Sequence, residues 1–202
     1  MRLAIRGFVC AVCLIGLLPT GVRAQSWSGG IKAGVIAGRL ETSGAGAFDT
    51  AADAGAIGGG FVGVTLGRAV RIQVEVLPAE RRFSSKGTPV SFDIRSRGLE
   101  VPLLLQVGRL SEARVRPLLF VGPQLNFISR VVQRVEGGET DLTDSVAGTD
   151  LAITFGGALE IAAGRGAVVL EVRASVGTSQ LNETSPPSFS SRAAGLLVGY
   201  RF

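Results

Sequence analysis

Alternation of apolar and polar residues is the main pattern in the chain after residue 24. The segment AVVLEVRASVG places Val168, Leu170 and Val172 on one face and Glu171 and Arg173 on the other. A period of two residues is typical of a β-strand whose two faces meet different surroundings. The chain has neither a sustained helical period nor, after residue 24, an apolar run of about 18 residues, which excludes a bundle of transmembrane helices. The pattern therefore predicts an all-β protein.

Eight segments follow this rule, at residues 29–40, 57–67, 69–83, 92–107, 115–129, 150–163, 166–179 and 191–202. Their connections alternate between short and long. The short ones are Gly67-Arg68, residues 109–114 and residues 164–166, whereas the long ones span residues 41–56, 84–91, 130–149 and 181–190 and are rich in Gly, Ser, Thr, Asp and Pro. Short periplasmic turns and long external loops are typical of outer-membrane barrels. We therefore predict an eight-stranded antiparallel up-and-down transmembrane β-barrel with both ends on the periplasmic side.

Charged residues of both signs lie on the polar faces of the predicted strands, at Lys32, Arg71, Glu75, Glu100, Glu160, Glu171 and Arg173. Opposite charges can pair inside a narrow barrel, away from lipid. An eight-stranded barrel has an interior that side chains fill, without an open channel. We therefore predict a charge network in the lumen, in which truncation of Glu171 or Arg173 lowers stability. The alternative is a soluble periplasmic barrel, similar to a lipocalin, that binds a small apolar ligand in its lumen.

The first 24 residues have the features of a secretory signal peptide. MRLAIR is basic, GFVCAVCLIGLL is a short apolar run, and VRA offers small residues before a cleavage point between Ala24 and Gln25. The apolar run is too short to span a membrane, which takes about 20 residues. We therefore expect residues 1–24 to be cleaved and residues 25–202 to form one barrel domain. Cleavage removes Cys10 and Cys13, the two cysteines, and lowers the formal net charge of +5 by three, so the charge does not indicate nucleic-acid binding.

The last strand alternates to its final residue, with Leu196, Val198, Tyr200 and Phe202 on one face. A closed barrel needs this strand to pair with the first one, because an open edge in lipid leaves backbone groups unsatisfied. The pattern resembles the C-terminal signal by which bacterial outer-membrane barrels are recognised for assembly. The resemblance implies the barrel-assembly machinery as a partner during biogenesis and the outer membrane of a Gram-negative-type envelope as the location.

The overall layout is similar to the small outer-membrane beta-barrel domain family, which includes PorT-like proteins and OmpA/OmpX-type barrels. The segments GGIKAGVIAGRL, RIQVEVLPAERRFSSKG, LEVPLLLQVG and RPLLFVGPQLNF carry the similarity, which extends over residues 27–202. PorT-likeness implies a link to protein secretion. Trp27 and Tyr200 are the only Trp and Tyr, so an aromatic belt at the membrane interfaces would consist mostly of Phe.

The residue types present limit the catalytic chemistry that the protein could perform. The chain contains no histidine, and the expected cleavage leaves no cysteine, so Ser/His and Cys/His nucleophiles are excluded. Known barrel enzymes of the outer membrane resemble one another in relying on a histidine base. Two of the lumen glutamates would suffice for acid–base catalysis, but ion pairing with lumen cations is the favoured interpretation. We therefore expect a non-enzymatic barrel without catalytic residues, cofactor or metal, surrounded by outer-membrane lipid, whose external loops contact a protein or surface ligand.

Two further motifs have weak support. GGGFVG matches G-x-G-x-x-G at Gly58, Gly60 and Gly63, but a dinucleotide site needs a helix after the glycines, and another strand follows here. Small residues at close-packed barrel positions explain these glycines better. Asp141, Asp144 and Asp150 offer oxygen ligands for calcium without the spacing of an EF-hand, so a solvated acidic loop is the favoured interpretation.

Overall fold

The computed structural model describes residues 25–43, 51–85, 92–110, 113–135, 138–141, 148–177 and 188–202. The predicted signal peptide, up to Ala24, lies outside these residues. The described residues form the strands β1 (Gln25–Ser43), β2 (Ala51–Leu66), β3 (Val70–Ser85), β4 (Phe92–Gly108), β5 (Val115–Val135), β6 (Gly138–Asp141), β7 (Thr149–Ala163), β8 (Gly166–Gly177) and β9 (Ser188–Arg201). No helix among the described residues is long and apolar enough to cross a membrane.

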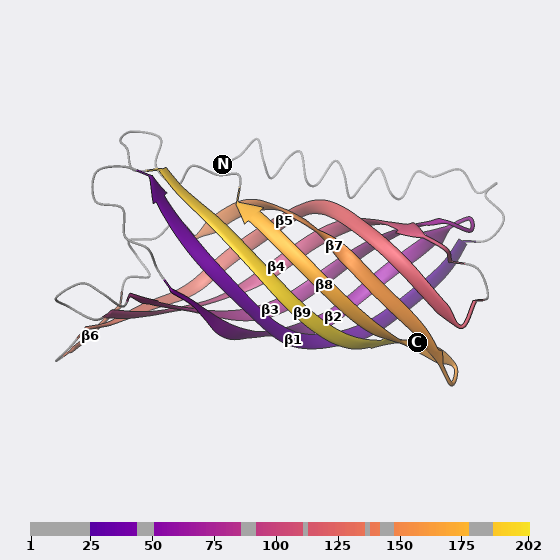
Figure 1. The fold of residues 1–202 in the computed structure, drawn as a ribbon, viewed down its shortest axis with the longest axis horizontal. Helices are drawn as coiled ribbons and strands as arrows, with labels where there is room; N and C mark the ends of the chain where they lie inside the picture. Colours follow the sequence, from indigo (N-terminus) through magenta and orange to yellow (C-terminus); the bar gives the residue numbers. More distant parts are fainter. Residues whose placement is uncertain are drawn as a thin grey trace.

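Eight of these strands close into a barrel, as the sequence predicts (Figure 1). Hydrogen-bonded neighbours follow the order β4-β3-β2-β1-β9-β8-β7-β5, and β4 also pairs with β5 to complete the ring. The first and last strands meet with Gly30 opposite Arg201, and the Phe202 amide donates to the Gly29 carbonyl over 3.0 Å. β6 is a short additional strand that pairs with the outer part of β5 alone.

The two ends of the barrel differ. At one end β2–β3 and β7–β8 are joined by tight turns in which Gly67 and Gly164 have φ values of 72° and 61°, a conformation that favours glycine. At the other end the strands extend further than predicted. Residues 41–43, 51–56 and 130–135 are strand rather than loop, because continued pairing satisfies their backbone N–H and C=O groups in the ladder.

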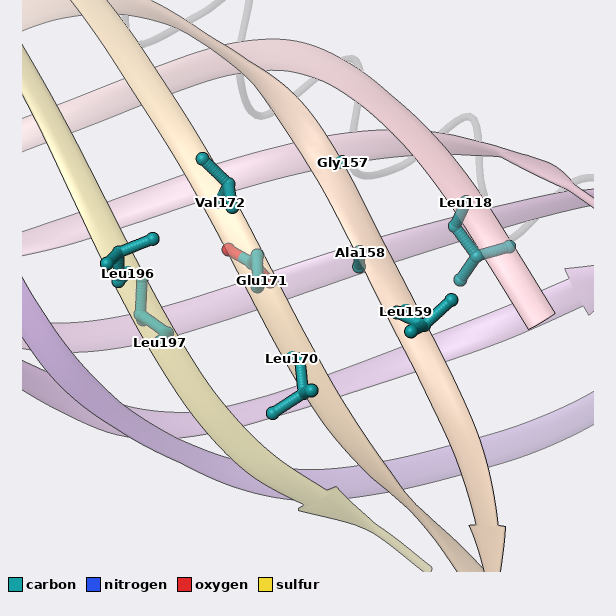
Figure 2. Close-up of a pocket in the computed structure, with 9 residues that line it drawn as sticks. All are labelled: Leu118, Gly157, Ala158, Leu159, Leu170, Glu171, Val172, Leu196 and Leu197. Atoms are coloured by element: carbon teal, nitrogen blue, oxygen red, sulfur yellow. The ribbon is translucent and has the colours of Figure 1, made fainter. Parts of the chain in front are cut away.

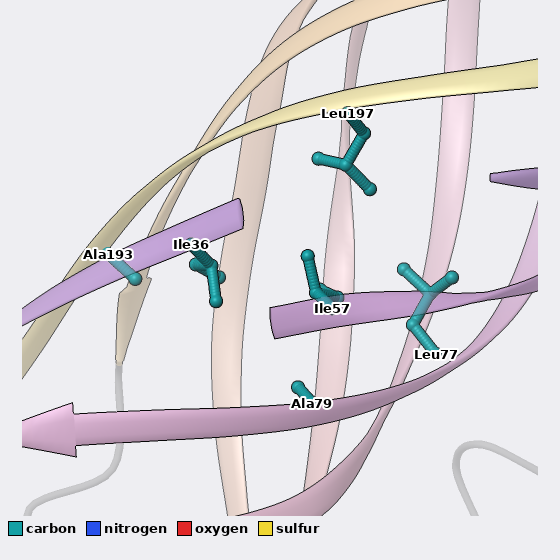
Figure 3. Close-up of a cluster of buried hydrophobic side chains, with 6 residues drawn as sticks. All are labelled: Ile36, Ile57, Leu77, Ala79, Ala193 and Leu197. Carbon is teal, nitrogen blue, oxygen red and sulfur yellow. The ribbon is translucent and has the colours of Figure 1, made fainter. Parts of the chain in front are cut away.

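The barrel is apolar outside and largely polar inside. Exposed side chains on the outer faces include Ile31, Val62, Leu119, Val172 and Leu196. The interior contains charged and amide side chains together with two apolar clusters, of which Figure 3 shows the one formed by Ile36, Ile57, Leu77, Ala79, Ala193 and Leu197. A water-soluble barrel would have the opposite arrangement, with its apolar residues inside. The structure therefore does not fit the alternative of a lipocalin-like barrel.

Candidate functional site: three charged layers inside the barrel

A closed ring of charges lies in the middle of the lumen, and we call it the middle layer. The Lys32 Nζ atom lies 2.6 Å from Oε1 of Glu75 and 2.6 Å from Oε2 of Glu171. Arg173 completes the ring, since its Nη2 lies 2.6 Å from Oε2 of Glu75 and its Nε donates to Oε1 of Glu171 over 2.6 Å. Gln73 adds a hydrogen bond of 2.7 Å to Glu75.

The middle layer is buried and balanced in charge. Each of the four charged side chains is at most 2% exposed. Two cations face two carboxylates, and each charged group contacts both groups of opposite sign. Such contacts offset the large cost of removing charges from water only when every partner is present. The layer can therefore close the lumen while remaining stable.

A second layer, the short-turn layer, lies closer to the tight turns and is unbalanced. Glu160 is fully buried and accepts hydrogen bonds from Arg71, over 2.8 Å, and from Arg201. Arg116 approaches the same carboxylate to 3.5 Å. Three guanidinium groups therefore share one carboxylate. The ring of Phe61 lies between this layer and the middle layer, with its centroid 5.2 Å from the Lys32 ammonium and 5.7 Å from the Arg201 guanidinium.

A third layer, the external layer, lies toward the long strands. Arg81 contacts Glu100 over 2.6 Å, and Gln124 donates to the other oxygen of Glu100 over 2.9 Å. Gln124 also donates to Asn126 over 2.6 Å and accepts a hydrogen bond from Thr154. β3 contributes Arg71, Glu75 and Arg81 to the three layers in turn, which establishes their order along the barrel.

The structure places all seven predicted lumen residues inside the barrel, but in separate groups. Lys32, Glu75, Glu171 and Arg173 meet in the middle layer, whereas Arg71 and Glu160 meet nearer the turns. Glu100 contacts none of the predicted cations and binds Arg81 instead. The residues that the sequence analysis did not select are Gln73, Arg81, Gln106, Arg116, Gln124, Asn126, Thr154 and Arg201. The inward alternation of their strands was the signal that could have identified them.

The residues predicted to form the assembly signal lie on the outer face of β9. Leu196, Val198 and Phe202 are exposed toward the lipid side. Tyr200 donates its hydroxyl hydrogen bond to the Ala163 carbonyl over 3.0 Å, which holds the end of β9 against the end of β7. Gln25, on the other side of the predicted cleavage point, is the first residue of β1.

The weaker motifs lie in settings that do not match the ligand sites they resemble. Gly58, Gly60 and Gly63 lie within the antiparallel strand β2, and a Cβ at Gly63 would lie 3.3 Å from Cδ of Arg71. The expectation of a solvated loop is wrong for Asp150, which is buried and accepts a hydrogen bond from Asn126 over 3.4 Å. Asp144 lies outside the described residues. Within the described part of the chain, no group of His, Cys, Asp and Glu side chains could hold a metal ion.

The lipid-facing wall contains an apolar hollow of about 490 Å³ over β5, β7, β8 and β9 (Figure 2). Gly157 provides no side chain there, and the exposed side chains around it are Leu170, Val172 and Leu196. An exposed apolar surface of this kind is stable in contact with acyl chains and unstable in water.

Residues 23–183 match the family model described as outer membrane protein beta-barrel domain. The chain belongs to this family. Family membership places the protein in the bacterial outer membrane, with lipid around the barrel. It also agrees with the exposed apolar belt, with the closed ring of strands and with the position of the charged side chains inside.

Among solved structures, this outer-membrane barrel is similar to OprG from Pseudomonas aeruginosa, with a TM-score of 0.51 and 10% sequence identity over 88% of this chain and 97% of that chain. Neisserial surface protein A has a TM-score of 0.49 and 15% sequence identity, over 89% of this chain and 98% of that chain. Ail of Yersinia pestis has a TM-score of 0.48 and 13% sequence identity, over 88% of this chain and 99% of that chain. The likeness to OprG supports the fold. No curated protein matches the chain significantly.

Proposed function

We propose that this protein is a closed, non-enzymatic outer-membrane barrel that acts through its external end. The observation that carries the proposal is the middle layer, in which Lys32, Glu75, Glu171 and Arg173 are buried and form ion pairs with one another across the lumen. A pathway for ions or solutes would have to separate these groups and leave buried charges without partners. The lumen is therefore a structural element, and interactions take place at the ends of the barrel.

The absence of histidine supports a non-enzymatic role, because no imidazole base is available anywhere in the chain. The lumen glutamates that would have to replace it are engaged with cations. Glu75 and Glu171 each contact two of them, and Glu160 contacts three. A carboxylate held in this way is a poor base because its neighbours stabilise the charged form.

Exposed arginines at the external end indicate a partner of negative charge. Arg95, Arg97, Arg130 and Arg192 are exposed in the outer parts of β4, β5 and β9. Arg97 and Arg130 lie directly opposite each other in the β4–β5 ladder. Like charges in this position disfavour strand pairing unless an anion lies nearby, and Glu80 supplies one for Arg97 at 3.1 Å. The exposed guanidinium groups at this end would attract an anionic ligand at the cell surface.

Biogenesis follows from the two ends of the sequence. We propose that the signal peptide is removed between Ala24 and Gln25, and that Leu196, Val198, Tyr200 and Phe202 are the contact for the barrel-assembly machinery. The PorT-like resemblance implies a more specific role, in which the external end takes part in protein secretion. The support for this role is the analogy between folds.

Two measurements test the proposal. In planar lipid bilayers we expect no stable conductance steps, and a reproducible channel would contradict a closed lumen. Whole cells that display the protein should retain dextran sulfate, and the triple variant R95Q/R97Q/R130Q should lose most of this binding. The matched control R68Q/R109Q/R114Q removes three exposed arginines from the opposite end and should bind like the wild type. Equal loss in both variants would contradict a specific role of the external end.

A further inference from the structure

A pocket of about 320 Å³ lies at the end of the lumen that carries the tight turns, beside the short-turn layer. We call it the mouth pocket. Four arginines and three hydroxyl residues supply its polar lining: Arg71, Arg116, Arg165, Arg201, Ser26, Ser28 and Thr65. In outer-membrane barrels the short turns face the periplasm, so this pocket is accessible from the periplasmic side.

The charge of the mouth pocket is strongly positive. Glu160 is the carboxylate that contacts Arg71, Arg116 and Arg201, and it can neutralise only one of the three guanidinium groups. Arg165, in the β7–β8 turn, adds a fourth cation to the lining. Clefts with walls of low dielectric constant concentrate the field of such charges and attract ions of the opposite sign.

Several donors in this region are buried and have no hydrogen-bond partner. Arg201 is only 6% exposed, yet its Nε and Nη1 atoms are both unpartnered. The Nε atom of Arg116 and the hydroxyl of Ser28 are unpartnered as well. Buried donors nearly always bond to protein, water or a ligand, because leaving one unsatisfied is costly. The three residues that carry these donors all line the mouth pocket, so a ligand held there would lie beside them.

We propose that the mouth pocket binds a tetrahedral oxyanion of the phosphate class. Guanidinium groups present paired N–H donors that match the oxygens of such an anion, and hydroxyl groups add single donors. A tetrahedral anion accepts hydrogen bonds in several directions at once, as donors on β1, β5 and β9 require. The anion is either free phosphate or the phosphate of a phospholipid headgroup in the periplasmic leaflet.

The test uses the protein isolated from outer membranes in dodecyl maltoside, a detergent without phosphate. Inorganic phosphate is titrated by calorimetry at constant ionic strength. We expect saturable binding at one site, and we expect S28A and R165Q to weaken it by about fivefold or more. S28A removes a hydroxyl that has no partner in the fold, so its unfolding midpoint in urea should equal or exceed that of the wild type.

The matched control is R68Q. Arg68 is an exposed arginine in the β2–β3 turn at the same end of the barrel, and it does not line the mouth pocket. R68Q should retain phosphate binding within about twofold of the wild type. R97Q, at the external end, should do the same. If no saturable binding is found, or if R68Q weakens it as much as R165Q does, the proposal is wrong.

A second titration separates the two sources of the anion. Dihexanoyl phosphatidylglycerol, below the concentration at which it forms micelles, is compared with inorganic phosphate. Tighter binding of the lipid identifies the headgroup as the ligand, whereas tighter binding of inorganic phosphate identifies the free ion. Either result depends on the same donors, so S28A must weaken whichever ligand binds more tightly.

Discussion

The middle layer and the short-turn layer are built from the same residue types but are balanced differently. In the middle layer, two cations and two carboxylates contact one another in a closed ring. In the short-turn layer, Arg71, Arg116 and Arg201 surround Glu160 alone. Each charged group of the balanced set contacts both groups of opposite sign, whereas the unbalanced set, near an opening, has more cations than its one carboxylate can neutralise. Charge count and access to solvent thus separate a structural ring from a candidate binding site.

The largest expected effect comes from breaking the balanced ring. R173A leaves Glu75 and Glu171 buried with Lys32 as their common cation. We expect a loss of about 3–5 kcal/mol in the free energy of unfolding, the usual cost of removing one partner from a buried ion pair. Urea unfolding in detergent micelles, followed by the difference in gel mobility between boiled and unboiled samples, measures it.

E171A and the double variant E171A/R173A complete a mutant cycle for this ring. Because the two residues contact each other, the double variant should lose less stability than the sum of the single variants, by about 0.5–3 kcal/mol. If neither single variant lowers the unfolding midpoint, the polar face of β8 does not depend on buried pairing, and the comparison between the layers fails.

The unbalanced layer should respond to anions where the balanced ring does not. E160Q removes the carboxylate that Arg71, Arg116 and Arg201 share, and we expect a loss of about 1.5–3 kcal/mol, the worth of hydrogen bonds to a charged group. Adding phosphate at constant ionic strength should raise the unfolding midpoint of E160Q by more than that of R173A. Equal recovery in both variants would show that phosphate acts on stability in general rather than at the mouth pocket.

The sequence predicts the barrel well because strand alternation is a local property. Each inward-facing charge could be assigned from its own strand, and Glu75, Glu160 and Glu171 are indeed all buried. The partners could not be assigned in the same way, because pairing across the lumen depends on the register of eight strands. The register of β4 against β5 shifts between Arg97 and Gly98, and no local pattern indicates that shift.

Arg201 shows a second limit of the sequence. Because its neighbours Tyr200 and Phe202 are large and apolar, the last strand was interpreted mainly by its outward face. The same alternation implies that Arg201 faces inward, where it binds Glu160.

The lengths of the strands at the external end were underestimated for another reason. Polar residues rich in Gly and Ser are typical of loops, yet backbone pairing continues through residues 41–43 and 51–53.

An intermediate effect is expected at the wall between the two layers. A Cβ at Gly30 would lie 2.3 Å from Cζ of Phe61 and 2.4 Å from the Tyr200 carbonyl oxygen. G30A should therefore destabilise the barrel by about 1–3 kcal/mol, as overpacking does, measured again by urea unfolding. G60A is the matched control on the next strand, since its Cβ would have no neighbour closer than 3.7 Å. A neutral G30A would mean that Phe61 moves freely and does not separate the layers.

The smallest effect is expected outside the lumen. Arg97 Nε donates to Glu80 Oε2 over 3.1 Å, but 61% of the Arg97 side chain is exposed. Water and salt screen such a pair, so R97Q should change the free energy of unfolding by less than about 1 kcal/mol, and added salt should reduce the difference further. R173A removes a guanidinium group from a buried site, so its effect is the one to compare with that of R97Q. If R97Q costs as much as R173A under the same conditions, burial is not what distinguishes the lumen charges from those on the surface.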